Sequence, residues 1–138
     1  MSLKILYDYA MKHVGKPYMW GGDDPMAGFD CSGLILELLA CAGITFKHDK
    51  TAHQLYEYFA KHGDLNRGLG ALCFYGNPER VTHVAMFLDD NFIIEAGGGN
   101  SKTQTLNDAI MQNAYIRVRH YEHRRDVCAI LMPRYQIK

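Results

Sequence analysis

The sequence predicts an α+β fold in which N-terminal helices pack on a C-terminal antiparallel β-sheet of about five strands. Apolar residues recur at helical spacing only in the first half of the chain. The second half instead contains short segments rich in aromatic and β-branched residues, bounded by turn-forming residues. Helices followed by strands favour this class, because alternating strands and helices would indicate a parallel sheet.

Length and charge limit the organisation of the chain and its partners. The 138 residues predict one domain, 1–138. A chain of this size buries roughly 68% of its unfolded surface and needs no disulfide or metal to fold. The 15 basic and 15 acidic residues cancel, so no net charge attracts nucleic acid or an acidic membrane. No run approaches the roughly 20 apolar residues of a membrane span.

Two helices are expected before residue 45. The first follows apolar spacing from Leu3 to Val14 and stops at Gly15. The second runs from about residue 31 to 42 and stops at Gly43. It is apolar on most sides except at Glu37, which predicts a buried central helix.

Two more helices and one loop are expected. Thr51 and Gln54 form a capping box for a helix that ends near Gly63. A short helix is expected over 105–112. The segment 21–28 contains glycines, aspartates and a proline, which predict a loop.

The expected strands all lie after residue 70. Each is four to eight residues long, as half-buried strands usually are. The segments are ALCFY (71–75), HVAMFL (83–88), FIIEA (92–96), YIRVRHY (115–121) and VCAILM (127–132).

Cysteine usage favours a reducing compartment. The four cysteines form no CxxC pair, and Cys41, Cys73 and Cys128 fall in apolar stretches where core packing accounts for them. Charged and polar residues between Lys4 and His13 interrupt the N-terminal segment, so no apolar signal core is present. We therefore expect synthesis in the cytoplasm without a signal peptide.

Cys31 differs from the other cysteines because it lies where a glycine-rich loop becomes a helix. Asp30 is a good N-cap, which makes Cys31 the first helical residue. There, free backbone N–H groups and the helix dipole favour the thiolate, the nucleophilic form. A buried cysteine at a helix start is common, but the polar flank of Asp30 and Ser32 indicates the wall of a cleft.

A cysteine nucleophile needs a base, and His83 is the best placed of the seven histidines. It opens an expected strand in which alternation puts it on the same face as the small Ala85. His120 and His123 are expected in a solvated turn between the last two strands.

Glu95, at the end of the next strand, is the candidate for orienting the imidazole. Hairpin parity decides whether it shares a face with His83. A two-residue turn would put Glu95 opposite Val84, on the wrong face. A three-residue loop over 89–91 puts it opposite Ala85 and diagonal to His83. We predict the three-residue loop.

The segments GKPYMWGGDDPMAGFDCSGL, THVAMFL and IIEA together resemble the NlpC family of papain-like bacterial cell-wall cysteine peptidases. The resemblance extends from about Val14 to Leu131. It implies a papain-like fold, with Cys31 as the nucleophile, His83 as the base and Glu95 as the third catalytic residue.

The same resemblance implies a substrate pocket lined by Tyr18, Asp30 and Ser32. It also implies that Trp20 and the glycines at 21–22 are structural, with the indole packed under a tight loop.

The activity implied by the resemblance is hydrolysis of peptidoglycan stem peptides, at the bond between the side-chain carboxyl of D-glutamate and the diamino acid. No cofactor or metal is needed. The resemblance to compact phage and prophage copies of the domain also implies delivery to the wall by a phage tail or at lysis.

Three alternatives stay open at this point. The chain could be a phage structural or wall-binding component with little turnover. A Cys–His pair also serves acyl transfer to acceptors other than water. His120, His123 and Cys128 are close enough in sequence to suggest a metal site, but they lack an established zinc spacing and a fourth ligand.

Overall fold

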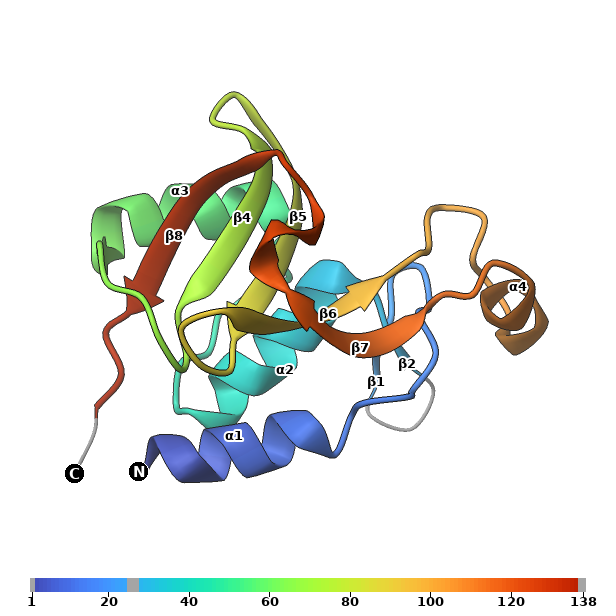
Figure 1. The fold of residues 1–138 in the computed structure, drawn as a ribbon, viewed down its shortest axis with the longest axis horizontal. Helices are drawn as coiled ribbons and strands as arrows, with labels where there is room; N and C mark the ends of the chain where they lie inside the picture. The colour runs from blue at the N-terminus through green and yellow to red at the C-terminus, as the bar shows by residue number, and fades with distance from the viewer. Residues whose placement is uncertain (1, 25–27, 137–138) are drawn as a thin grey trace.

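The computed structural model describes residues 2–24 and 28–136. These residues form a six-stranded antiparallel sheet with helices packed against it (Figure 1). No helix among these residues is long and apolar enough to cross a membrane. In chain order the elements are α1 (Leu3–Met11), β1 (Asp23–Asp24), β2 (Gly28–Phe29), α2 (Cys31–Cys41), α3 (Ala52–His62), β3 (Gly63–Asp64), β4 (Leu72–Asn77), β5 (Arg80–Phe87), β6 (Phe92–Gly97), α4 (Leu106–Met111), β7 (Tyr115–His120), the 3-10 turn η1 (Tyr121–His123) and β8 (Val127–Pro133).

The strand order in the main sheet is β3-β8-β4-β5-β6-β7, with every neighbouring pair antiparallel. The predicted α+β class is confirmed, with the short β3 as a sixth strand. The expectation of a plain loop over 21–28 is wrong in part, because Asp23–Asp24 pairs with Gly28–Phe29 in a small second sheet. Residues 25–27 of that segment lie outside the described residues.

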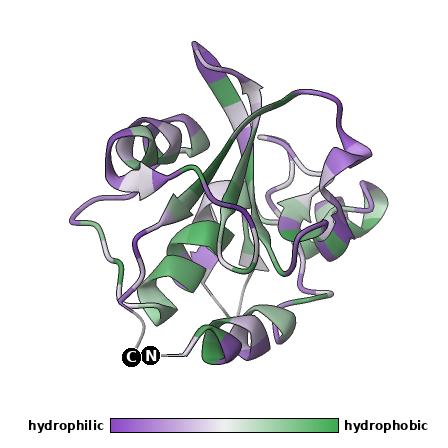
Figure 2. Ribbon diagram, turned by 60° about the vertical axis from the view of Figure 1, so that its left-hand side comes forward, coloured by the Kyte–Doolittle hydropathy of each residue, from purple (hydrophilic) through white to green (hydrophobic). Residues whose placement is uncertain are grey.

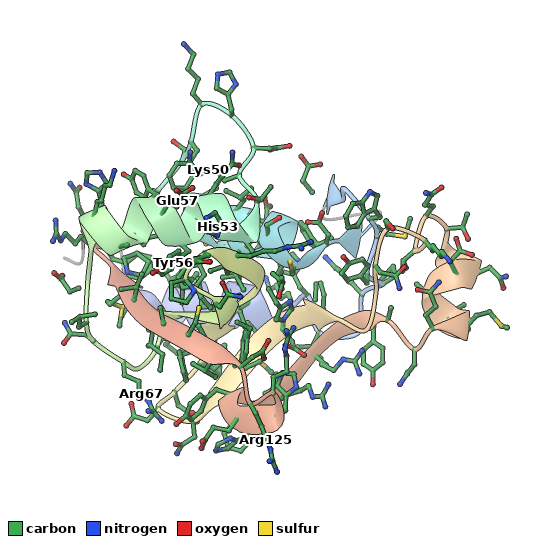
Figure 3. The ribbon with its side chains drawn as sticks, turned by 90° about the horizontal axis from the view of Figure 1, so that it is seen from above. Lys50, His53, Tyr56, Glu57, Arg67 and Arg125 are labelled. Atoms are coloured by element: carbon green, nitrogen blue, oxygen red, sulfur yellow. The ribbon has the colours of Figure 1, made fainter. Side chains whose placement is uncertain are left out.

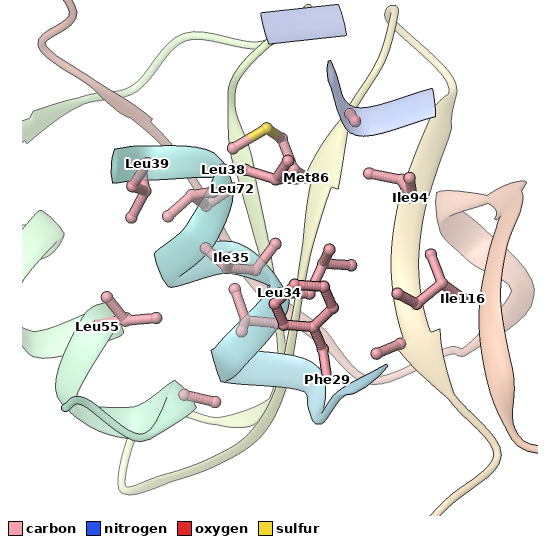
Figure 4. Packing of buried hydrophobic residues seen from close by; sticks show 14 of the residues in the cluster. Phe29, Leu34, Ile35, Leu38, Leu39, Leu55, Leu72, Met86, Ile94 and Ile116 are labelled. Atoms are coloured by element: carbon pink, nitrogen blue, oxygen red, sulfur yellow. The ribbon is translucent and has the colours of Figure 1, made fainter. Parts of the chain in front are cut away.

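The central helix α2 fills the space between the sheet and α1. Its four core positions, Leu34, Ile35, Leu38 and Leu39, have no exposed surface, which confirms the predicted buried helix (Figure 4). They pack against the face of the sheet that includes Met86. Figure 2 shows this helix and the central strands as hydrophobic, and the loops as largely hydrophilic.

The first helix buries a narrower face than its apolar spacing predicts. Only Leu6 and Ala10 of α1 are buried, whereas Tyr7 and Met11 are exposed. A single helix at the edge of a domain contacts its neighbour along one narrow stripe, and apolar residues beside that stripe stay in solvent.

The opposite face of the sheet carries a second apolar cluster. Ala85 and Phe87 of β5 belong to it, while Val84 and Met86 belong to the helix-covered core, as strand alternation predicts. Tyr121 of η1 packs against this second cluster, as do Val127, Ile130 and Met132 of the strand β8. Both faces of β5 thus contribute to an apolar cluster, and the strand is buried over most of its length.

The hairpin between β5 and β6 has the predicted three-residue loop. Phe87 is paired with Ile93, and the N–H of Leu88 donates to the carbonyl of Phe92, which leaves 89–91 as the loop. The paired residues of β5 and β6 end at Met86 and Ile94. Beyond that point β6 continues to pair with β7, up to Gly97.

Candidate active site

The position of Cys31 is fixed by the start of α2. Asp30 is the N-cap, as predicted, and its Oδ1 accepts a hydrogen bond of 2.7 Å from the N–H of Gly33. Its other oxygen accepts one of 3.0 Å from the N–H of Gly21, so the carboxylate ties the preceding loop to the helix. A Cβ atom at Gly33 would overlap the carbonyl oxygen of Gly22, so only glycine allows this close approach.

His83 lies in β5 rather than at its first residue, because the strand begins at Arg80. The start of this strand is attached to α3, since the N–H of Val81 donates to Nδ1 of His53 at 3.0 Å. Figure 3 shows His53 on that helix. The backbone of the strand that carries His83 is thus attached to α3.

The structure brings His83 and Glu95 together on one face of the sheet. Nε2 of His83 donates to Oε1 of Glu95 at 2.8 Å, and the two residues are only 8% and 1% exposed. Continuing the register of the hairpin puts Glu95 opposite Ala85 and diagonal to His83, as the odd loop length predicts. The geometric part of the prediction is confirmed.

The charge on His83 depends on its two partners. Burial alone would lower its pKa, but hydrogen bonding to the Cys31 sulfur and to Glu95 outweighs burial and raises the pKa to about 9. Burial opposes the charged form of Glu95 as well. The hydrogen bond and positive charge of His83 nevertheless hold the pKa of Glu95 below its ordinary value.

His123 contacts the same carboxylate, which sequence reasoning missed. Its Nε2 donates to Oε1 of Glu95 at 3.0 Å, so the expectation that His123 lies in a solvated turn is wrong. Burial lowers the pKa of His123, although the charge of Glu95 opposes that effect, and the ring is a neutral donor near pH 7. The sequence has no local signal for the contact of His123 with Glu95, because this contact depends on how η1 folds back over the sheet.

A cavity of about 410 Å³ surrounds these groups. It is lined by Tyr18, Cys31, Thr82, His83, Glu95, Ala96, Gly97, Gly98, Gly99, Arg119, His123 and Arg124. A Cβ atom at Gly99 would overlap the ring of Tyr18, and Gly98 has a φ of +82°, so this wall requires glycine. The run of three glycines was a sequence signal that the prediction did not use.

The predicted substrate-binding residues fall into two places. Tyr18 lines the cavity with Cys31, and burial raises the pKa of its phenol, which therefore stays a hydrogen-bond donor. Asp30 and Ser32 instead line a separate hollow of about 180 Å³ that also includes Lys50. The expectation that Trp20 packs under a loop is wrong, because this residue is 55% exposed.

The remaining candidate ligands do not converge. Within the described parts of the chain, no group of three or more His, Cys, Asp or Glu side chains is arranged to hold a metal ion. His123 is committed to Glu95, and Nδ1 of His120 accepts from the N–H of Glu122. Cys73 is buried, whereas Cys41 and Cys128 are only half buried.

The fold and the site define a papain-like α+β domain whose pocket contains the thiol of Cys31, the imidazole of His83 and the carboxylate of Glu95. The chain belongs to the NlpC/P60 family, whose model matches residues 15–120. This confirms the resemblance noted in the sequence.

Curated relatives and solved structures agree with the family. The bifunctional muramidase/DL-endopeptidase CwlT of Bacillus subtilis is 34% identical over 106 residues, 75% of this chain and 29% of that protein. Murein DD-endopeptidase MepH of Escherichia coli is 28% identical over 125 residues, 86% of this chain and 45% of that protein. The chain thus spans less than half of either relative. Their names support the hydrolase class expected from the sequence.

Among solved structures, an NLP/P60 family protein of Staphylococcus aureus described as similar to a lipoprotein matches with a TM-score of 0.70 and 25% identity, covering 97% of this chain and 42% of that one. The peptidoglycan hydrolase RipB of Mycobacterium tuberculosis matches with a TM-score of 0.69 and 22% identity, covering 98% and 65%. The papain-like fold is therefore confirmed.

Proposed function

We propose that the chain is a cysteine peptidase that hydrolyses amide bonds in peptidoglycan stem peptides, with Cys31, His83 and Glu95 as its catalytic residues. One observation carries the proposal: Cys31, His83 and Glu95 line one cavity of about 410 Å³, in which Nε2 of His83 donates to Glu95 at 2.8 Å. Nucleophile, base and orienting acceptor in that order are what acyl transfer through a thioester requires. The endopeptidase names of the relatives support the substrate class.

In the proposed mechanism the thiolate of Cys31 attacks the amide carbon while His83 is protonated. The C–N bond breaks as His83 gives its proton to the leaving amine, which leaves a thioester on the sulfur. His83 then takes a proton from water, and the resulting hydroxide displaces the sulfur and releases a carboxylic acid. The N–H of Cys31, at the start of α2, donates to the oxyanion in both steps.

For the bond cleaved, we propose the amide between the side-chain carboxyl of D-glutamate and the diamino acid. The DL-endopeptidase name of CwlT supports this choice, whereas the name of MepH describes a DD-endopeptidase. Tyr18, Asp30 and Ser32 are the proposed substrate-binding residues. Delivery by a phage tail or at lysis stays a prediction from the sequence.

Digestion of purified peptidoglycan, with the products identified by mass spectrometry, tests this function. We expect fragments that end in D-glutamate with a free side-chain carboxyl, and no products from folded Cys31→Ala. Products transferred to an added amine instead of water would indicate an acyltransferase. No products, with Cys31 reacting with iodoacetamide no faster than an ordinary thiol, would indicate a binding component and contradict the proposal.

A further inference from the structure

Arg119 and Arg124 line the active-site cavity, and Arg117 of β7 is paired with Glu95 in the sheet. Arg117 and Arg124 already bond to groups of the protein. The Nη2 atom of Arg117 donates to the carbonyls of Gly97 and Asn113, at 3.0 and 2.7 Å. Arg124 makes a two-pronged contact with Asp126, at 2.9 and 2.6 Å. Their guanidinium groups stabilise the protein itself.

Arg119 is different. It lines the cavity, its side chain is 41% exposed, and no hydrogen bond from it is found among the residues that the structure describes. Its closest carboxylate atom is Oε2 of Glu95 at 3.9 Å, which is too long for a hydrogen bond. The register of β6 and β7 pairs Arg119 with Ile93, so it lies diagonal to Glu95 on the same face.

The charges in the cavity leave Arg119 without a full counter-ion. The other oxygen of Glu95 accepts from both His83 and His123, and the His83 imidazolium offsets the carboxylate charge. The guanidinium therefore presents unused donors to the cavity that holds Cys31. A planar guanidinium fits a carboxylate through two parallel hydrogen bonds, and a partly buried site strengthens them.

We propose that Arg119 binds a carboxylate of the substrate beside the scissile amide, and that the enzyme therefore selects acidic over amidated stem peptides. This rests on the proposed peptidase function. A glutamate linked through its side chain keeps a free α-carboxylate on the residue that is attacked. The diamino acid on the leaving side can carry a second carboxylate. The carboxylate that Arg119 binds therefore belongs either to the glutamate or to the diamino acid.

Three synthetic stem peptides test the inference. One has both carboxylates free, one has the D-glutamate α-carboxylate amidated, and one has the diamino acid carboxylate amidated. We expect kcat/KM to fall about 10- to 100-fold for the peptide whose amidated position is the one that contacts Arg119, the size of a lost charged hydrogen bond. The other amidated peptide should be cleaved like the free one, which identifies the source.

Arg119→Gln should remove most of that preference, and Arg119→Lys should keep part of it, because lysine has the charge without the planar fork. The ratio of free to amidated peptide isolates substrate recognition, since any effect on the pKa of His83 applies to all three peptides. The matched control is Arg125→Gln, which removes the same charge. Arg125 is exposed, and Figure 3 shows its side chain directed away from the ribbon near η1. The Arg125→Gln variant should prefer free over amidated peptide as strongly as the wild type does.

Equal cleavage of all three peptides by the wild type would overturn the inference and leave the proposed function intact. An Arg119→Gln variant that loses activity equally on all three would overturn it too, because the side chain would then act through Glu95 or the fold. Failure to cleave any of the peptides would overturn the proposed function and this inference with it.

Discussion

The pKa of His83 is raised only because its interactions with two partners outweigh its burial. The imidazole is almost fully buried, which by itself favours the neutral ring. The Cys31 sulfur and the Glu95 carboxylate both stabilise the imidazolium. The protonation state of the proposed general acid is therefore a property of three side chains, so a change in either partner should be visible in the titration of His83.

The pH profile of cleavage should show this dependence. We expect kcat/KM to fall as the pH rises through about 9, because the imidazolium that protonates the leaving amine is then lost. Glu95→Gln removes an interaction that raises the pKa of His83, so the alkaline limb should move to lower pH. NMR titration of the His83 ring would check the assignment. An alkaline limb at the same pH in both proteins would contradict the role of Glu95.

His123 supports Glu95 in the same way that Glu95 supports His83. His123→Ala removes a donor from a carboxylate that is 1% exposed, which raises the pKa of Glu95 and weakens its hold on His83. We expect a loss of about tenfold in kcat/KM, the size of one hydrogen bond to a charged group. The alkaline limb should also shift to lower pH.

His123→Gln is the matching conservative change, since its amide can donate to the same oxygen and should restore part of the activity. His48→Ala, at an exposed loop position, controls for loss of a histidine elsewhere. If His123→Gln and His123→Ala were equally impaired with unchanged pH profiles, the contact with Glu95 would not be the reason.

At the scale of the element, the start of α2 combines a cap with close packing. Asp30 bonds to the N–H groups of Gly33 and Gly21, so one carboxylate orders both the helix and the loop before it. We expect Asp30→Ala to cost about 0.5–2 kcal/mol of folding stability, measured by chemical denaturation. The alkylation rate of Cys31 should change as well, because the helix start that holds the sulfur loosens.

Thr105→Ala is the comparison for this change. Thr105 caps α4 with the same kind of bond, to the N–H of Asp108 at 3.1 Å, and it does not line the active-site cavity. Its loss should cost a similar stability and leave the alkylation of Cys31 unchanged. Equal alkylation rates in both variants would mean that the cap does not position the thiol.

Helix starts and the hairpin were predictable from the sequence because their signals are local. Asp30 and Thr51 cap helices at the expected positions, and the odd loop puts Glu95 on the face of His83. The short pairing of β1 with β2 has no such local signal, since two residues on each side show no alternation. The contact of His123 with Glu95 was not predictable from the sequence either, because the two residues are separated by 28 positions.

At the scale of the whole molecule, the site lies at the boundary between two apolar clusters. The helix-covered core includes Leu38 and Met86, and the second cluster includes Phe87 and Tyr75 on the other face of the sheet. Cys31 comes from the helix side, whereas His83 lies on the face of the second cluster. They meet beyond the last pair of β5 and β6, at Met86 and Ile94, where the ladder no longer separates the two faces.

Stability and catalysis should therefore separate according to distance from that boundary. Leu38 is fully buried and lies seven positions after Cys31 in α2, about 10 Å along the helix axis. Leu38→Ala should cost about 2–5 kcal/mol, the transfer of its side chain plus the cavity that remains. Ile110→Ala, at an exposed position of α4, should stay within about 0.5 kcal/mol of the wild type.

Because the start of α2 is held by Asp30 rather than by Leu38, kcat/KM per folded molecule should change little in Leu38→Ala at a temperature where it is folded. Urea denaturation measures the stability, and the rate of peptide cleavage, normalised by titration of Cys31 with iodoacetamide, measures kcat/KM per active molecule. A loss of activity in fully folded Leu38→Ala as large as the loss of about tenfold expected for His123→Ala would show that the core and the site are coupled more tightly than the structure indicates.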